Sequence, residues 1–175
     1  MEQKIFLNQQ VDLSVLPSVD DLHYTGLEPK YKFILQLIVV IVTSIIFIGL
    51  STLFFFGDPP LWIALTILAA WILISTLIFA FVSKIFKYKG YAVRTRDLVY
   101  KKGWLYKKQI TVPFSRIQHV DIKQGVLERR YKLGTLNLYT AGGQSSDLTI
   151  PGLKIEDAKR FKSFILGVME SDEEE

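Results

Sequence analysis

The chain of 175 residues contains no cysteine and only two histidines, His23 and His119. Without cysteine it has no disulfide framework, no thiolate metal site and no cysteine nucleophile. Metal and nucleophilic sites need several converging His, Cys or carboxylate groups, so this inventory argues against an enzyme, and we expect no metal and no cofactor. A phosphate-binding loop is also missing, because the sequence from Ala141 to Gln144 lacks the spacing and the lysine of a P-loop. We predict a non-enzymatic protein in which His119 has a structural role.

Charge is missing from two long stretches. Residues 33–56 and 61–83 contain no Asp, Glu, Lys, Arg or His. As helices, both would reach about 35 Å, which is enough to cross the ~30 Å hydrocarbon core of a bilayer. A buried helix of a soluble protein would normally show a polar face over this length, and these stretches show none. We therefore predict two transmembrane helices. Since ionisable residues usually mark an ion path, transport by this chain alone is not expected.

Residues 57–60 connect the two stretches and contain one glycine and two prolines, which indicates the tip of a tight helical hairpin. The tip carries Asp58 and no basic residue, whereas lysines flank both outer ends of the hairpin. By the positive-inside rule, both termini are expected on the cytoplasmic side and the tip on the opposite side. The natural setting is the bacterial inner membrane, in which the chain would be a multi-pass protein. The flanking lysines are Lys30, Lys32, Lys84, Lys87 and Lys89.

Outside the hairpin, the chain divides into three parts. Residues 1–32 are polar and rich in turn residues, so we expect a cytoplasmic N-terminal arm that is mostly loop, with a possible short docking segment over residues 11–16. Residues 84–170 are expected to form a cytoplasmic domain. From Tyr88 to Glu170 the sequence has 16 Lys and Arg against 7 Asp and Glu, so this domain is strongly basic. Residues 171–175 form an acidic tail.

Short runs of β-branched and aromatic residues fill most of the basic domain and predict six strands in an antiparallel meander. A helix is expected near its end, over residues 154–170, where apolar residues recur at spacings of three and four. Such a helix could cover the open end of a small β-barrel. The six predicted strands lie within residues 91–94, 97–103, 104–112, 116–122, 135–141 and 147–150.

Five motifs stand out in this region, at residues 116–122, 124–129, 133–138, 140–143 and 151–153. Together they resemble the YdbS-like membrane proteins that carry a bacterial pleckstrin-homology-like (PH) domain. The resemblance covers roughly residues 88–169, and a helical hairpin directly before the domain is also usual in that family. It implies a membrane α-helical hairpin followed by an α+β PH-like split β-barrel with a C-terminal capping helix. The chain departs from the family at Tyr131-Lys132, where relatives often carry an aromatic residue and a glycine, and in its acidic tail.

The clearest surface signal is a turn with two lysine pairs around two aromatic residues. Lysines are attracted to anionic leaflets and Trp or Tyr prefers the headgroup level, so this turn suits a membrane interface. The alternative is an ordinary solvated hairpin whose lysines prevent aggregation. Arg129, Arg130 and Lys132 form a second basic cluster with the same two interpretations, and Arg116, Arg129 and Arg130 are secondary candidates. The residues of the turn are Lys101, Lys102, Trp104, Tyr106, Lys107 and Lys108.

These observations favour a membrane-anchored interaction module that engages anionic lipid headgroups, a membrane-protein partner or a second copy of itself. Nucleic acid is not expected as a partner, because the basic residues beside the membrane anchor already have a topological explanation. The alternative function is an accessory subunit of a membrane transport or export complex. In that case small residues on the helices, such as Gly49, Ala69 and Ala70, would pack against the helices of a partner.

Overall fold

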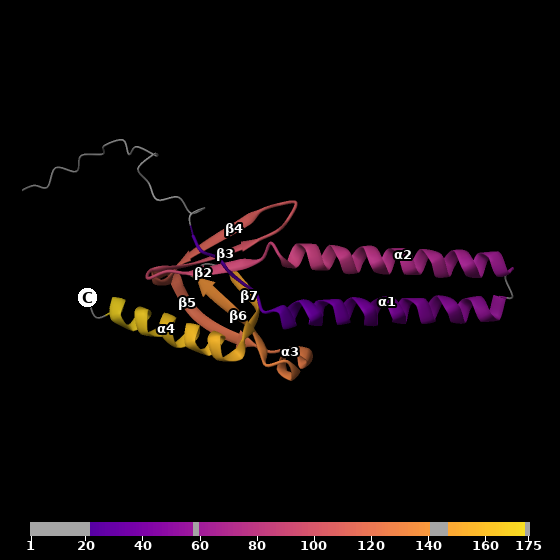
Figure 1. Cartoon of the computed structure of the whole chain (residues 1–175). Coiled ribbons are helices and arrows are strands. Elements are labelled where there is room, and N and C mark those ends of the chain that lie inside the picture. Colours follow the sequence, from indigo (N-terminus) through magenta and orange to yellow (C-terminus); the bar gives the residue numbers. More distant parts are fainter. Residues whose placement is uncertain (1–21, 58–59, 141–146, 174–175) are drawn as a thin grey trace, which may run out of the picture.

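The computed structural model describes residues 22–57, 60–140 and 147–173 and consists of a helical hairpin joined to a sheet-rich domain (Figure 1). Helix α1 spans Pro29–Gly57 and helix α2 spans Leu61–Phe86, and they lie side by side and extend away from the sheets. The two predicted transmembrane helices are therefore present. Each is longer than predicted at its domain end, where lysines continue the helix beyond the apolar stretch.

The hairpin exposes its apolar side chains instead of burying them. Helix α2 has no buried residue, and Ile45 and Leu73 are 63% and 60% exposed. Such a surface is stable only in a lipid environment. Between the helices, the indole N–H of Trp71 donates a hydrogen bond to the Thr43 carbonyl oxygen (2.9 Å), and the Trp71 ring lies 4.6 Å from the Phe47 ring. These contacts hold the two helices together.

Within the described residues, seven strands form two separate antiparallel sheets, in the orders β1-β2-β3-β4 and β5-β6-β7. All six predicted strands are present, but residues 104–107 form a turn and belong to no strand. The two described sheets do not close, so the predicted split β-barrel is corrected to two open sheets. The strand bounds are β1 Thr25–Gly26, β2 Gly90–Val93, β3 Asp97–Lys102, β4 Lys108–Pro113, β5 Ile117–Lys123, β6 Leu133–Thr140 and β7 Leu148–Lys154.

Helix α4, Ile155–Glu173, lies along β5, β6 and β7 and agrees with the predicted helix (Figure 1). Its apolar stripe faces the core, where Ala158 and Ile165 are 0% and 1% exposed. Phe161 adds an edge-to-face contact with Tyr91 of the other sheet, with ring centroids 5.6 Å apart. Helix α4 therefore links the two sheets through one shared core. Two short helices, the 3-10 helix η3 (Phe114–Arg116) and α3 (Val126–Arg130), complete the domain.

The segment before α1 is part of the domain, which corrects the expectation of a loop up to residue 32. Thr25 and Gly26 pair with Tyr91 and Gly90, so β1 adds a strand to the first sheet. Leu27 follows and is buried in the core. A two-residue strand is too short for a period-2 pattern, so the sequence did not reveal it. The docking segment predicted over residues 11–16 lies outside the described residues.

The first turns of α1 are packed against the same domain. The Tyr31 ring lies on Gly152, a residue with a φ of 68° and no side chain in the way. The Glu28 N–H donates a hydrogen bond to the Gly152 carbonyl oxygen (3.2 Å), and the Glu28 carboxylate pairs with Lys154 (3.1 Å). Ile34, one turn further along, is 3% exposed. Helix α1 is thus joined to the domain by packing as well as by the chain.

Candidate functional site

The turn between β3 and β4 is sharp because of Gly103. This residue has a φ of 98°, and a Cβ at this position would overlap the Tyr106 carbonyl oxygen. Only glycine adopts this conformation without strain. The turn holds three apolar or aromatic side chains outward, since Trp104, Leu105 and Tyr106 are 37%, 76% and 85% exposed. Exposed apolar groups at the tip of a hairpin are typical of a surface that meets another phase or a partner.

This hairpin bends back toward the end of α2, as Figure 1 shows. The ammonium group of Lys84, in the last turn of α2, lies 3.7 Å from the centre of the Trp104 ring. Such a cation–π contact fixes the hairpin tip beside the helix. The structure thereby brings together all six residues predicted in this turn. They occupy the end of β3, the turn and the start of β4.

A pair of polar residues shows where the Lys84–Trp104 contact lies along the helical hairpin of α1 and α2. The Gln36 side-chain amide donates a hydrogen bond to the Ser83 hydroxyl (2.8 Å), which places these residues at the same level on the two antiparallel helices. From Leu37 to the tip of the hairpin, α1 carries no charged residue and rises about 30 Å, the thickness of a hydrocarbon core. Lys84 directly follows Ser83 and therefore marks the boundary of the apolar region. Trp104 lies at this boundary.

A second protrusion reaches the same level from the other side. Helix α3 lies beside α1, and a groove between them is lined by Ile34, Leu35 and Ile38 on one side and by Val126 and Leu127 on the other. Val126 is 88% exposed although it lies beside the apolar part of α1. An exposed valine at this position is favourable where lipid covers it.

Helix α3 is fixed to the domain by its own cap. The Gly125 N–H and the Thr135 hydroxyl both donate hydrogen bonds to the Glu128 carboxylate, each at 2.9 Å. The next two residues, Arg129 and Arg130, are exposed. The predicted second basic cluster is therefore carried by a short helix that the sequence analysis did not predict.

Lys132 has a φ of 56°. This is the left-handed region, which glycine adopts without a steric cost. The backbone at this position therefore favours glycine. In this chain a lysine adopts the same conformation and adds one positive charge next to Arg129 and Arg130.

Arg116 does not join either protrusion. It ends η3, which follows β4 at the end of the β3–β4 hairpin opposite the turn. The six residues of β4 separate it from the lysine pairs by about 20 Å. It lies instead beside Ser115, Gln118 and Thr140. The structure therefore does not bring Arg116 together with the lysines of the β3–β4 turn.

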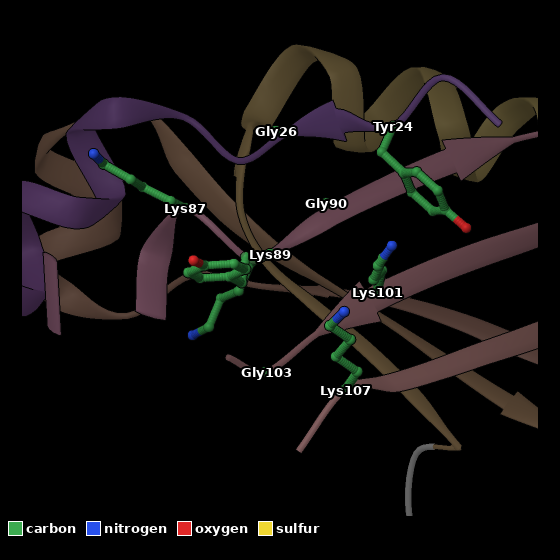
Figure 2. A pocket seen from close by; sticks show the side chains of 9 residues that line it. Tyr24, Gly26, Lys87, Lys89, Gly90, Lys101, Gly103 and Lys107 are labelled. Carbon is green, nitrogen blue, oxygen red and sulfur yellow. The ribbon is translucent and has the colours of Figure 1, made fainter. Parts of the chain in front are cut away.

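A basic pocket that the sequence analysis did not predict lies where α2 meets the sheet. Its walls come from β1, the segment after α2 and the two ends of the β3–β4 turn (Figure 2). The sequence signal for this pocket is Lys87-x-Lys89, two lysines that the positive-inside rule also explains as a marker of topology. The lining residues are Tyr24, Gly26, Lys87, Tyr88, Lys89, Gly90, Lys101, Gly103 and Lys107.

The comparisons with known proteins agree with this architecture. Residues 32–169 match the family described as Bacterial PH domain. The UPF0699 transmembrane protein YdbS of Bacillus subtilis (strain 168) is 30% identical over 131 residues, which cover 74% of this chain and 80% of YdbS. The UPF0699 transmembrane protein YdbT of the same organism is 28% identical over 68 residues, which cover 38% of this chain and 14% of YdbT. The predicted resemblance is thereby confirmed.

Among solved structures, the chain is similar to a crystal structure of a DUF1696 family protein with a pleckstrin-homology domain from Shewanella loihica PV-4. The two share 16% sequence identity, and the match covers 46% of this chain and 70% of that chain with a TM-score of 0.37.

Proposed function

The chain belongs to the bacterial PH domain family and to the UPF0699 transmembrane proteins, and from this premise we propose that it is a non-enzymatic, membrane-anchored module that engages anionic lipid headgroups. The hairpin anchors it in the bilayer. The β3–β4 turn and α3 rest on the leaflet from which the PH-like domain projects.

One observation carries this proposal: two separate protrusions reach the same membrane level on either side of the hairpin. Trp104 contacts Lys84 beside α2, and Val126 lies beside Ile38 of α1. Both protrusions combine exposed apolar side chains with basic residues, which is the composition that headgroup regions favour. A solvated hairpin that merely avoids aggregation would not need a matching protrusion on the opposite side.

The energetics favour even weak contacts. A lysine near an anionic leaflet contributes on the order of 1 kcal/mol, and the turn carries four. The domain is already held at the surface by the hairpin and by the packing of α1, so binding costs little translational freedom. Since exposed charges are screened within about 8 Å at physiological ionic strength, the contact is expected to weaken with salt.

The test uses Trp104 as a reporter in the full-length chain. Phe replaces Trp62 and Trp71, and the protein is reconstituted in nanodiscs of neutral or anionic lipid. We expect acrylamide to quench Trp104 less in anionic nanodiscs, with the protection fading as salt rises. Replacing the four turn lysines with Gln should remove the difference. Equal quenching in both lipids at low salt would overturn the proposal.

We also propose that both termini lie in the cytoplasm of a bacterial cell. The lysines at the domain end of the hairpin and the lone Asp58 at its tip support this orientation. Since the chain has no cysteine, single cysteines report topology directly. In intact cells, Asp58→Cys should react with a membrane-impermeant maleimide, and Ser163→Cys on α4 should react only after the cells are permeabilised. The reverse pattern would contradict this orientation.

The second candidate function is an accessory subunit of a transport or export complex. Gly49, Ala69 and Ala70 face outward from the hairpin, where small residues allow another helix to approach closely. A multi-span protein that co-purifies in stoichiometric amount from mild detergent would support this role, provided that Ala69→Leu disrupts the association. A chain that purifies alone would contradict it.

A further inference from the structure

We propose that the basic pocket between α2 and the first sheet binds the phosphate group of one anionic phospholipid headgroup. This inference rests on the proposed function, since it requires the domain to lie on the leaflet. It goes further because it assigns a defined site for one lipid, with Lys87 and Lys89 as additional contributors. A diffuse attraction between the lysine-rich turn and the membrane would not need such a site.

The pocket is formed by segments that are distant in the sequence. β1 and β2 meet at Gly26 and Gly90, the segment from Lys87 to Lys89 enters from α2, and the β3–β4 turn closes the remaining side. The volume is about 280 Å³. This space suits a phosphate with part of a headgroup, and it is smaller than the sites of most drug-sized ligands.

Glycines keep the pocket open. Gly26 and Gly90 are paired in register, and a Cβ on Gly90 would lie 3.2 Å from the Cβ of Tyr24. A Cβ on Gly26 would meet no atom within 4 Å, so this wall borders open space. The polar lining consequently consists of lysine and tyrosine side chains around an unfilled centre.

The lining of the pocket is strongly basic. Four of the lining residues are lysines, and within residues 22–57, 60–140 and 147–173 none of the four forms an ion pair with a carboxylate. Figure 2 shows Lys101 and Lys107 extending from the two sides of the turn, whereas Lys87 points away from them. Lys101 also lies 5.2 Å from the centre of the Tyr24 ring.

The surroundings of Lys89, one of the lining lysines, disfavour its positive charge. Burial and the neighbouring Lys102 lower the pKa of Lys89. Both effects disfavour its charged form, and a bound anion would reverse the second. A compact dianion or monoanion such as a phosphate can accept hydrogen bonds from several ammonium groups at once, which a single carboxylate of the protein does not do here.

The position of the pocket favours a lipid over a soluble anion. Lys87 and Lys89 follow Phe86, the last residue of α2, and Lys84 one turn earlier marks the boundary of the apolar region. The pocket therefore opens at headgroup level, where phosphate groups of the leaflet are concentrated. Tyr88, which is 42% exposed, stands at its rim, as expected of an aromatic residue at a membrane interface.

The β3–β4 hairpin offers a matched pair of variants that separates binding in this pocket from general electrostatic attraction to the membrane. Lys101→Gln/Lys107→Gln removes two lysines that line the pocket, and Lys102→Gln/Lys108→Gln removes two lysines of the same turn that do not line it. Lys102 and Lys108 are paired across the two strands, so both variants change the same hairpin by the same charge. Far-ultraviolet circular dichroism checks that each variant is folded.

The first experiment measures lipid retention by the full-length chain. Protein purified in mild detergent is titrated with phosphatidylglycerol or phosphatidylcholine and analysed by native mass spectrometry. We expect saturable retention of one phosphatidylglycerol per chain, weakened about tenfold in the pocket variant and less than twofold in the matched control. Gly26→Leu, which adds bulk at the wall without changing charge, should also weaken retention.

The outcomes distinguish the pocket from the proposed function. If both lysine variants lose retention of phosphatidylglycerol equally while Trp104 stays protected in anionic nanodiscs, the pocket is not the lipid site. The proposed lipid-facing function would then remain intact. Absence of Trp104 protection in the Trp104-only reporter chain with all four turn lysines intact would overturn both the pocket and the proposed function. Inorganic phosphate, added at matched ionic strength, tests the source of the anion. Saturable phosphate binding without retention of phosphatidylglycerol would overturn a lipid as the ligand.

Discussion

The two membrane helices enter the PH-like domain in opposite ways. Helix α1 begins inside it: Leu27 is in the core, Tyr31 covers Gly152, and Ile34 is 3% exposed. Helix α2 ends at its edge, where Lys87 is exposed and Lys89 lines a basic pocket. The α1 junction is therefore buried and tightly packed, whereas the α2 junction, beyond Phe86, is exposed and charged.

The difference shows how one connection can be mechanical while the other stays available for binding. Close packing leaves no room for a ligand and transmits movement between hairpin and domain. Like charges around an open space are unfavourable unless an anion offsets them, so the α2 junction is suited to a ligand and poorly suited to rigid support. We expect substitutions at the α1 junction to affect stability and those at the α2 junction to affect binding.

The largest effect is expected from Gly152→Ala. The new Cβ would lie 2.6 Å from both Cβ and Cδ1 of Tyr31, and the φ of 68° is strained for alanine. Steric overlap and backbone strain together should lower the free energy of unfolding by about 3 kcal/mol or more. Denaturant unfolding of the full chain in detergent measures this change. Gly26→Ala, at a glycine with open space, is the control and should be nearly neutral.

Leu27→Ala should cost slightly less. Leu27 is 5% exposed in the core, so truncation leaves a cavity that destabilises the protein by about 2–3 kcal/mol. The matched change at the other junction is Tyr88→Ala, which removes a side chain that is 42% exposed and should change stability by less than about 1 kcal/mol. If the two variants unfold at the same denaturant concentration, the contrast between the junctions is wrong.

The stability of the folded domain should also depend on pH, because Tyr100 is buried in the core. Burial raises the pKa of Tyr100 to about 12. In the unfolded chain the pKa of tyrosine is about 10, so the neutral Tyr100 side chain contributes its full stabilisation of the folded state below pH 10. This contribution is lost as the pH rises from 10 to 12. The expected loss is on the order of 2 kcal/mol. Tyr100→Phe should flatten the decline of stability over this range, and an unchanged pH profile would contradict the assignment.

The smallest effect is expected from Lys154→Gln. The Lys154 ammonium group pairs with Glu28 at the start of α1, and this partner raises the pKa of Lys154. Because the pair is exposed, it should contribute less than the packed residues around it, and its contribution should fade with salt. Thermal melting at low and high salt measures the difference between wild type and variant. A loss that is independent of salt would assign the effect to packing of the lysine stem.

Much of the candidate site could be predicted from local sequence. The turn lysines, Trp104 and Tyr106 are close in the chain, so a hairpin necessarily brings them together. Arg116 was grouped with them on charge alone, and the direction of β4 places it at the far end of the hairpin. Lys87 and Lys89 were missed as site residues because their pocket partners, Tyr24 and Lys101, come from distant segments.

By itself, the sequence determined the hairpin, the six longer strands, the final helix and the family, since each depends on a local pattern: uninterrupted apolar stretches, alternation, or apolar spacing of three and four. Only the tertiary structure decided that Thr25 and Gly26 add a strand, that α1 packs on the domain more extensively than α2 does, and that lysines from separate segments surround one pocket. These features depend on which segments meet across long separations in the chain, and contacts of that kind leave no periodic signal in the residues that make them.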